Sequence, residues 1–165
     1  MKGSQITKFD YYLRLSVIIF AALSPFICLL SFGYLKSLSQ YWESPLQPIF
    51  VISNAITSYY LITLDNWRPS AILLILLTAF SVEYYQDLHN IMAVAFFIVT
   101  AIPLKKANNF KFCFVIYLLS VLILPFSLFF AEVVAILAMC IYHTLSLHRL
   151  YDLSKQRVLI KDSIN

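Results

Sequence analysis

Long apolar runs alternate with short polar segments along the whole chain. Each run is predominantly apolar, and most approach the ~20 residues that a helix needs to cross a hydrocarbon core of ~30 Å. The runs cover residues 12–35, 46–64, 69–85, 88–104, 110–128 and 131–149. This pattern predicts an all-α fold, a polytopic transmembrane bundle with six spans.

The polar breaks support this division. Residues 36–45 contain Trp42 and residues 65–70 contain Trp67, and tryptophan is enriched where a membrane meets water. The apolar stretch 110–147 is too long for one helix, so we expect it to divide near residues 125–132.

The basic residues predict one orientation. If the N-terminus is cytoplasmic, all of the twelve Lys and Arg residues except Lys36 fall on the cytoplasmic side, while the outer side holds acidic residues. The cytoplasmic basic residues are Lys2, Lys8, Arg14, Arg68, Lys105, Lys106, Lys111, Arg149, Lys155, Arg157 and Lys161, and the outer acidic ones are Glu43, Glu83, Asp87 and Glu132. Because cytoplasmic loops are enriched in Lys and Arg, we expect both termini in the cytoplasm and a multi-pass protein of the cell (inner) membrane.

Composition excludes a soluble protein. Hydrophobic residues make up 61% of the chain and charged residues 12%, with a mean hydropathy of +0.82, whereas about a quarter of residues are charged in soluble domains. We expect a single transmembrane domain over residues 1–150 and a cytoplasmic tail over 151–165. The basic residues are dispersed, so no nucleic-acid partner is expected. The first apolar run is longer than the core of a signal peptide, and we expect it to be retained as a helix.

A cluster of polar residues is predicted at the outer rim of the bundle. Its members are Glu83, Asp87, His89, Asn90 and Glu132. Carboxylates and an imidazole suit a divalent metal or a proton relay, so Asp87, His89 and Glu132 are the candidate metal ligands if the loops bring them together. The alternative is that these are hydrated interfacial residues, with Asp87 capping a helix.

A second polar group is predicted at mid-membrane. Ser53, Asn54, Thr57 and Ser58 lie in one apolar run, and His143 lies in another. Hydrogen bonding between helices is one interpretation, and a polar cavity like that of a carrier is the other. Glu132 and His143 share a helix face but lie about 16 Å apart along the axis, too far to bind one ion.

Two short segments resemble known membrane families. The segment Y-W-E-S-P-L-Q-P-I-F-V-I-S-N, residues 41–54, is similar to the start of the core in alkaline ceramidase and adiponectin-receptor-like (CREST-type) membrane proteins. That resemblance implies a zinc-dependent hydrolase of a lipid or amide, although Tyr85 stands where the family's Ser-x-x-x-His element after Ser81 would place histidine, so the full histidine set is lacking. The segment L-H-N-I-M-A-V-A-F-F-I, residues 88–98, resembles uncharacterised bacterial six-helix membrane families, which implies a fold without an activity.

These features leave three interpretations of function. The first is a non-catalytic structural or accessory subunit of a membrane assembly, or a lipid-binding module, with no cofactor and no assigned catalytic residue. The second is an intramembrane metal-dependent hydrolase, which would use zinc or another divalent ion. The third is a small carrier or proton-coupled permease. In each case the partners are the lipid bilayer and, for an assembly, other membrane subunits or a second copy of the chain.

Overall fold

The fold is all-α, and the computed structural model describes residues 6–162, with side chains through residue 158. The α-helices are α1 (Lys8–Phe32), α2 (Gln47–Ile62), α3 (Arg68–Ala79), α4 (Val82–Lys106), α5 (Lys111–Ile123) and α6 (Leu128–Asp162). Three short 3₁₀ helices join them, η1 (Leu38–Glu43), η2 (Asp65–Trp67) and η3 (Asn108–Phe110). No strand occurs within these residues.

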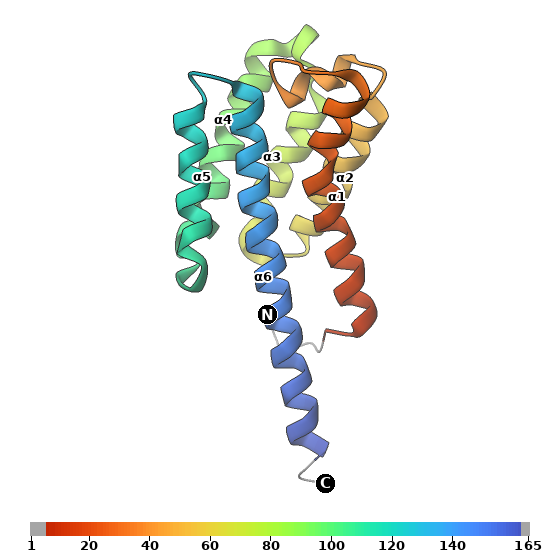
Figure 1. Ribbon diagram of the computed structural model, residues 1–165, viewed down its shortest axis with the longest axis vertical. Coiled ribbons are helices and arrows are strands. Elements are labelled where there is room, and N and C mark those ends of the chain that lie inside the picture. Colours follow the sequence, from red (N-terminus) through yellow and green to blue (C-terminus); the bar gives the residue numbers. More distant parts are fainter. Residues whose placement is uncertain (1–5, 163–165) are drawn as a thin grey trace.

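The helices form a closed ring. Each helix from α1 to α6 packs against the next along the chain, and α6 packs against α1 as well as α5. Figure 1 shows the helices running alternately up and down, with both described chain ends toward the same end of the bundle. We call this the termini end, and we call the opposite end, which carries η1, the outer end.

Local signals set the limits of α1. Thr7 Oγ1 accepts a hydrogen bond from the Asp10 N–H at 3.1 Å, and the Asp10 carboxylate accepts one from the Thr7 N–H at 3.4 Å, so the two residues form a capping box. The helix ends at Gly33, whose φ of 94° and ψ of −176° lie in a region that essentially only glycine adopts. The chain can therefore turn sharply there into η1.

The boundary between the third and fourth helices differs from the expected one. The sequence predicts segments over 69–85 and 88–104, but α3 ends at Ala79 and α4 begins at Val82. The Ser81 side chain accepts a hydrogen bond from the Tyr84 N–H at 3.3 Å, which starts a new helix. Tyr85 has non-helical dihedral angles, φ −135° and ψ 42°, so this first part of α4 is kinked. Residues 82–85, which were expected in the third span, and the expected break at 86–87 are therefore all part of α4.

The last helix is longer than the apolar pattern predicts. The expected span ends at residue 149, but α6 continues through the expected tail to Asp162. In Figure 1 this part extends beyond the ring at the termini end. Tyr151 stacks on Tyr11 with ring centroids 4.5 Å apart, and Ser154 Oγ accepts a hydrogen bond from the Ile6 N–H at 3.2 Å. These contacts attach the start of the described chain to the extension.

Small residues allow α6 to pack closely against its neighbours. Ala131, Ala135 and Ala138 are each at most 1% exposed. Side chains this small let helix backbones approach in a membrane, where packing rather than water exclusion drives association. The long helix α6 is therefore the element that closes the ring.

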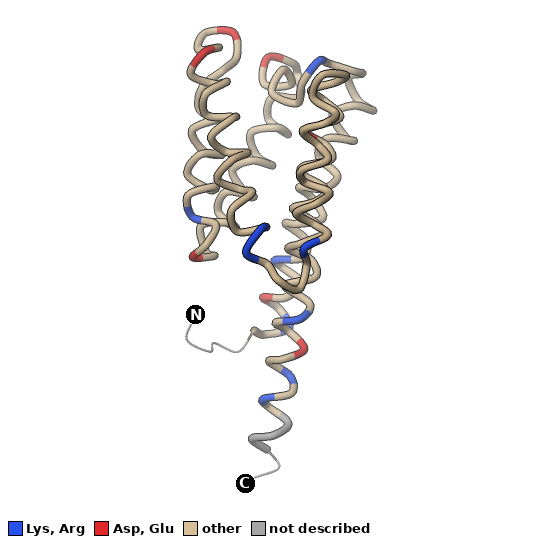
Figure 2. Tube along the Cα trace, turned by 90° about the vertical axis from the view of Figure 1, so that its left-hand side faces the viewer, with Lys and Arg blue, Asp and Glu red and all other residues tan. Residues whose placement is uncertain are grey.

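Within the part of the chain that the structure describes, three helices are long and apolar enough to cross a membrane: Lys8–Phe32, Val82–Lys106 and the Leu128–Val158 part of α6. Large apolar side chains are exposed on the outside of the bundle, for example Leu30, Ile98 and Phe126 at 86%, 63% and 88%. Such a surface suits lipid and not water. Figure 2 shows Lys and Arg gathered toward the termini end, whereas Lys36, between α1 and η1, lies at the outer end. These features indicate a membrane protein.

Candidate functional site

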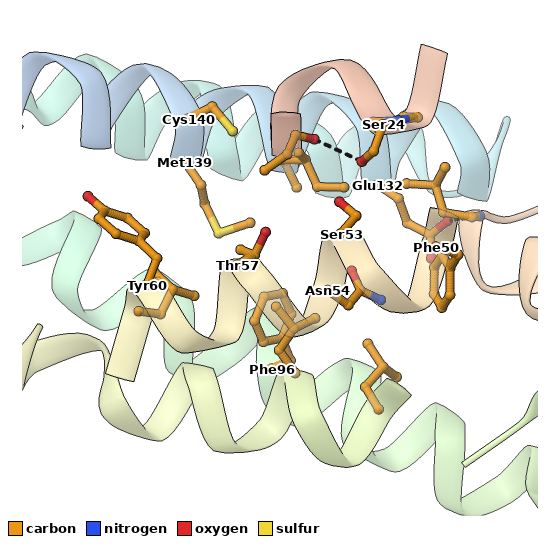
Figure 3. Close-up of a pocket in the computed structure, with 18 of the residues that line it drawn as sticks. Ser24, Phe50, Ser53, Asn54, Thr57, Tyr60, Phe96, Glu132, Met139 and Cys140 are labelled. Carbon is orange, nitrogen blue, oxygen red and sulfur yellow. Dashed lines mark hydrogen bonds between the residues drawn. The ribbon is translucent and has the colours of Figure 1, made fainter. Parts of the chain in front are cut away.

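The ring encloses a cavity, which we call the central cavity. Its volume is about 120 Å³, and its walls come from α1, η1, α2, α3, α4 and α6 (Figure 3). Most of the lining is apolar. A space of this size is large enough for several water molecules or for part of an alkyl chain.

One face of α6 runs the length of the cavity. Its lining residues are separated by alternating steps of three and one, the spacing of residues on one side of a helix. They are Glu132, Ala135, Ile136, Met139, Cys140 and His143. Glu132 and His143 are eleven residues apart, so they lie about 16 Å apart along the axis and mark opposite ends of this face.

The wall from α2 is polar. Ser53, Asn54 and Thr57 line the cavity, and Figure 3 shows Ser53 and Thr57 pointing into the same space as Met139. Ser24 of α1 also lines it, and its hydroxyl donates to the Ala21 carbonyl at 3.1 Å. The cavity therefore has a short polar band between largely apolar walls.

The predicted mid-membrane group is only partly gathered by the fold. Ser53, Asn54, Thr57 and His143 share the central cavity. Ser58 instead lines a second hollow between α2 and α3, and its buried hydroxyl has no hydrogen-bond partner among the described residues. A step of one residue around α2 is enough to direct Thr57 and Ser58 to different sides.

Glu132 links the outer end of the cavity to η1. Its Oε2 accepts a hydrogen bond from the Leu38 N–H at 2.7 Å, and Leu38 itself lines the cavity. The adjoining backbone is also attached, because the Phe129 N–H donates to the Lys36 carbonyl at 3.0 Å. The loop after α1 is thus fixed across the start of α6.

Further contacts hold η1 over the outer end. Tyr41 is fully buried and donates to the Gly33 carbonyl, and burial raises the pKa of the Tyr41 phenol, so the hydroxyl stays protonated as a donor. The Trp42 indole N–H donates to the Thr78 carbonyl at 2.7 Å, which ties η1 to α3. The outer end of the cavity is therefore covered by an ordered segment.

His143 lies at the other end of the cavity. It is 5% exposed, its Nδ1 is 3.3 Å from the Tyr60 hydroxyl, and its ring centroid is 4.3 Å from that of Trp67. Its Nε2 has no hydrogen-bond partner within the described part of the chain. An unpaired buried polar atom costs roughly 1–3 kcal/mol, so Nε2 is a candidate contact for a bound molecule or water.

The predicted outer-rim cluster does not form one site. His89 is 2% exposed, with Nδ1 2.7 Å from the Phe80 carbonyl and with Nε2 unpartnered among the described residues. The Glu83 N–H donates to Glu43 Oε1 at 2.6 Å, whereas Asp87 and Asn90 are exposed.

Of the predicted rim residues, Glu132 alone lines the central cavity. In residues 6–162 no group of three or more His, Cys, Asp or Glu side chains is placed to hold a metal ion. The predicted ligands Asp87, His89 and Glu132 therefore have separate surroundings.

Some residues of the site were not predicted from sequence. Tyr60 contacts His143, Cys140 lies on the cavity face of α6, and the Leu38 amide binds Glu132. The periodicity of α6 identifies Cys140 once Glu132 and His143 are placed on one face. No local pattern identifies the Leu38 amide, because its position depends on the path of the loop.

No family model matches the chain, and searches of curated proteins and of solved structures found no match either.

Proposed function

We propose that this protein crosses the membrane six times and that its central cavity binds an amphiphilic, lipid-like molecule, without catalysis. The observation that carries the proposal is the lining of the cavity: apolar walls, a polar band on α2, and Glu132 and His143 at its two ends. Ligand sites in proteins are typically concave and largely apolar, with a few polar groups that orient the ligand.

The closed ring supports six crossings. The helices α2, α3 and α5 contain 16, 12 and 13 residues, fewer than the ~20 of a typical span. Each packs between two neighbours in the ring, and 3₁₀ turns extend the chain beyond their ends. Short spans are accommodated by local thinning of the bilayer and by their flanking residues.

The charge distribution supports cytoplasmic termini. Most of the described basic residues lie toward the termini end (Figure 2), with Lys36 as the exception. Glu43 in η1 and Glu83 in the first turn of α4 lie at the outer end. Because cytoplasmic loops are enriched in Lys and Arg, this distribution supports a cytoplasmic location for the termini end and a location of the protein in the inner membrane.

The spacing of the ionisable groups favours binding over reaction. Acid–base catalysis requires groups within about 3 Å of the atoms that react. Glu132 and His143 are about 16 Å apart along α6, so they contact different parts of a bound molecule. A binding role, alone or as an accessory subunit, fits this arrangement.

The test compares lipid retention by the wild type and a cavity-filling variant. Protein is purified, transferred to a detergent-free peptidisc and examined by native mass spectrometry for co-purified amphiphiles. Thr57→Phe adds a ring at the lining and should remove the adducts. Tyr59→Phe is the matched control, because Tyr59 is 75% exposed on the same helix and does not line the cavity. Equal adducts in both variants, or none in the wild type, would overturn the proposal.

A further inference from the structure

We infer that the molecule bound in the central cavity has a cationic head, such as a protonated amine, that pairs with Glu132. This inference rests on the proposed binding function and specifies the chemical class of the ligand. It follows from the charges on the cavity wall, the hydrogen bonding of Glu132 and the charges around the outer end.

The cavity wall carries one carboxylate and no opposite charge. Within the described part of the chain, Glu132 is the sole Asp, Glu, Lys or Arg among the lining residues. The salt bridges within residues 6–158 join Arg68 to Asp65 and His148 to Asp152, and Glu132 takes part in neither. A carboxylate inside a membrane bundle is costly unless it is paired, so a cation in the cavity would supply the missing partner.

Glu132 retains capacity to bind a ligand. An ionised carboxylate has about four lone-pair positions on its two oxygens. The Leu38 N–H uses one position, on Oε2. That hydrogen bond also fixes the side chain at the outer end of the cavity, so a second donor would meet a carboxylate that is already oriented.

The charged groups around the outer end favour a cation. Glu43, Glu83 and Asp87 are exposed at this end and attract positive charge toward it. Lys36 is exposed here as well, and it makes no salt bridge with Glu132 within 4.0 Å. Its backbone carbonyl is bound by Phe129, which keeps this part of the loop beside α6.

The rest of the cavity suits an alkyl chain. From Glu132 toward His143, the α6 face presents Ala135, Ile136 and Met139. An amine at Glu132 would therefore be followed by apolar contacts along the axis of α6. A chain reaching His143 would extend about 16 Å.

The test uses probes with one chain length and different heads. Wild-type protein in peptidiscs is titrated with decylamine, decanol and decanoate, and each Kd is measured from the shift in thermal unfolding. We expect decylamine to bind at least about 10-fold more tightly than decanol, because the amine forms a charge-assisted hydrogen bond with Glu132. Decanoate should bind most weakly, because its carboxylate is repelled by that of Glu132. Glu132→Gln keeps an acceptor for Leu38 but removes the charge, so decylamine and decanol should then bind equally.

A matched control separates Glu132 from the general acidity of the outer end. Glu83→Gln removes an exposed carboxylate that lies outside the cavity and should leave the amine preference unchanged. An amine preference that survives Glu132→Gln, or one that Glu83→Gln abolishes, would overturn the inference.

The outcomes also separate this inference from the proposed function. If decanol or decanoate binds the wild type as tightly as decylamine, the cavity binds amphiphiles but the inference that its ligand has a cationic head is wrong. If no probe binds any form of the protein, the binding function itself fails, and the inference fails with it.

Discussion

Removing the Glu132 side chain should loosen η1 from the bundle. In the Glu132→Ala variant the Leu38 N–H loses its acceptor, and Leu38 is only 8% exposed, so water has little access. An unpaired buried N–H costs roughly 1–3 kcal/mol. Hydrogen bonds between helices in membrane proteins contribute on average about 0.6 kcal/mol to stability. This bond should contribute more, because it is 2.7 Å long and its acceptor is a carboxylate. We therefore expect a loss of about 2 kcal/mol in the local stability of η1.

The assay is hydrogen exchange by mass spectrometry on peptides from residues 33–46. A loss of about 2 kcal/mol corresponds to roughly 30-fold faster exchange at the Leu38 amide, since 1.4 kcal/mol is tenfold. Glu132→Gln keeps an acceptor oxygen and should change exchange by less than about 5-fold. Glu83→Ala, at an exposed position, is the control for general effects of charge. Unchanged exchange of η1 in Glu132→Ala would refute the role given to this hydrogen bond.

Three further substitutions test other contacts, each by thermal unfolding of the purified protein. Gly33→Ala should destabilise by about 1–3 kcal/mol through the backbone conformation alone, because an added Cβ at Gly33 would meet no atom within 4 Å; an unchanged midpoint would contradict the φ of 94°. Trp42→Phe should lose about 1 kcal/mol with its hydrogen bond to the Thr78 carbonyl, and a midpoint equal to wild type would argue against that bond. Tyr117→Phe removes a hydroxyl that donates to the Phe97 carbonyl at 3.0 Å, and a loss of about 0.6–1.7 kcal/mol is expected; no loss would indicate that α4 and α5 are joined by packing alone.

The all-α fold could be predicted from sequence because it depends only on the pattern of apolar and polar residues along the chain. Apolar runs bounded by polar residues locate the helices whatever the details of packing. The boundary at Ala79 could not be found this way, because the Ser81 side chain begins a helix whose first turns are polar. Likewise, the charged residues after 149 do not interrupt α6, since helix formation outside the membrane does not need apolar residues.

Some residues of the candidate site could likewise be predicted from sequence, and others could not. Glu132 and His143 on one face of α6 follow from the helical period, and the polar band of α2 follows from its composition. The contact of Glu132 with Leu38 joins residues 94 positions apart through a loop, and no local pattern encodes such a pairing. The outer-rim residues do not form one cluster, because residues close in sequence can face different sides of a helix. Asp87 is exposed, whereas His89, two positions later, is buried inside the bundle.

The most direct test of the six-crossing bundle is the accessibility of single cysteines. In a background with Cys28, Cys113 and Cys140 changed to Ala, Asp87→Cys reports on the outer end, and Asp65→Cys reports on η2, where the Asp65 side chain is 59% exposed. With intact cells and a membrane-impermeant maleimide, we predict that Asp87→Cys is labelled at once and that Asp65→Cys is labelled only after the membrane is permeabilised. Labelling of Asp65→Cys in intact cells would show that α2 and α3 do not cross the membrane as proposed, and would contradict the account.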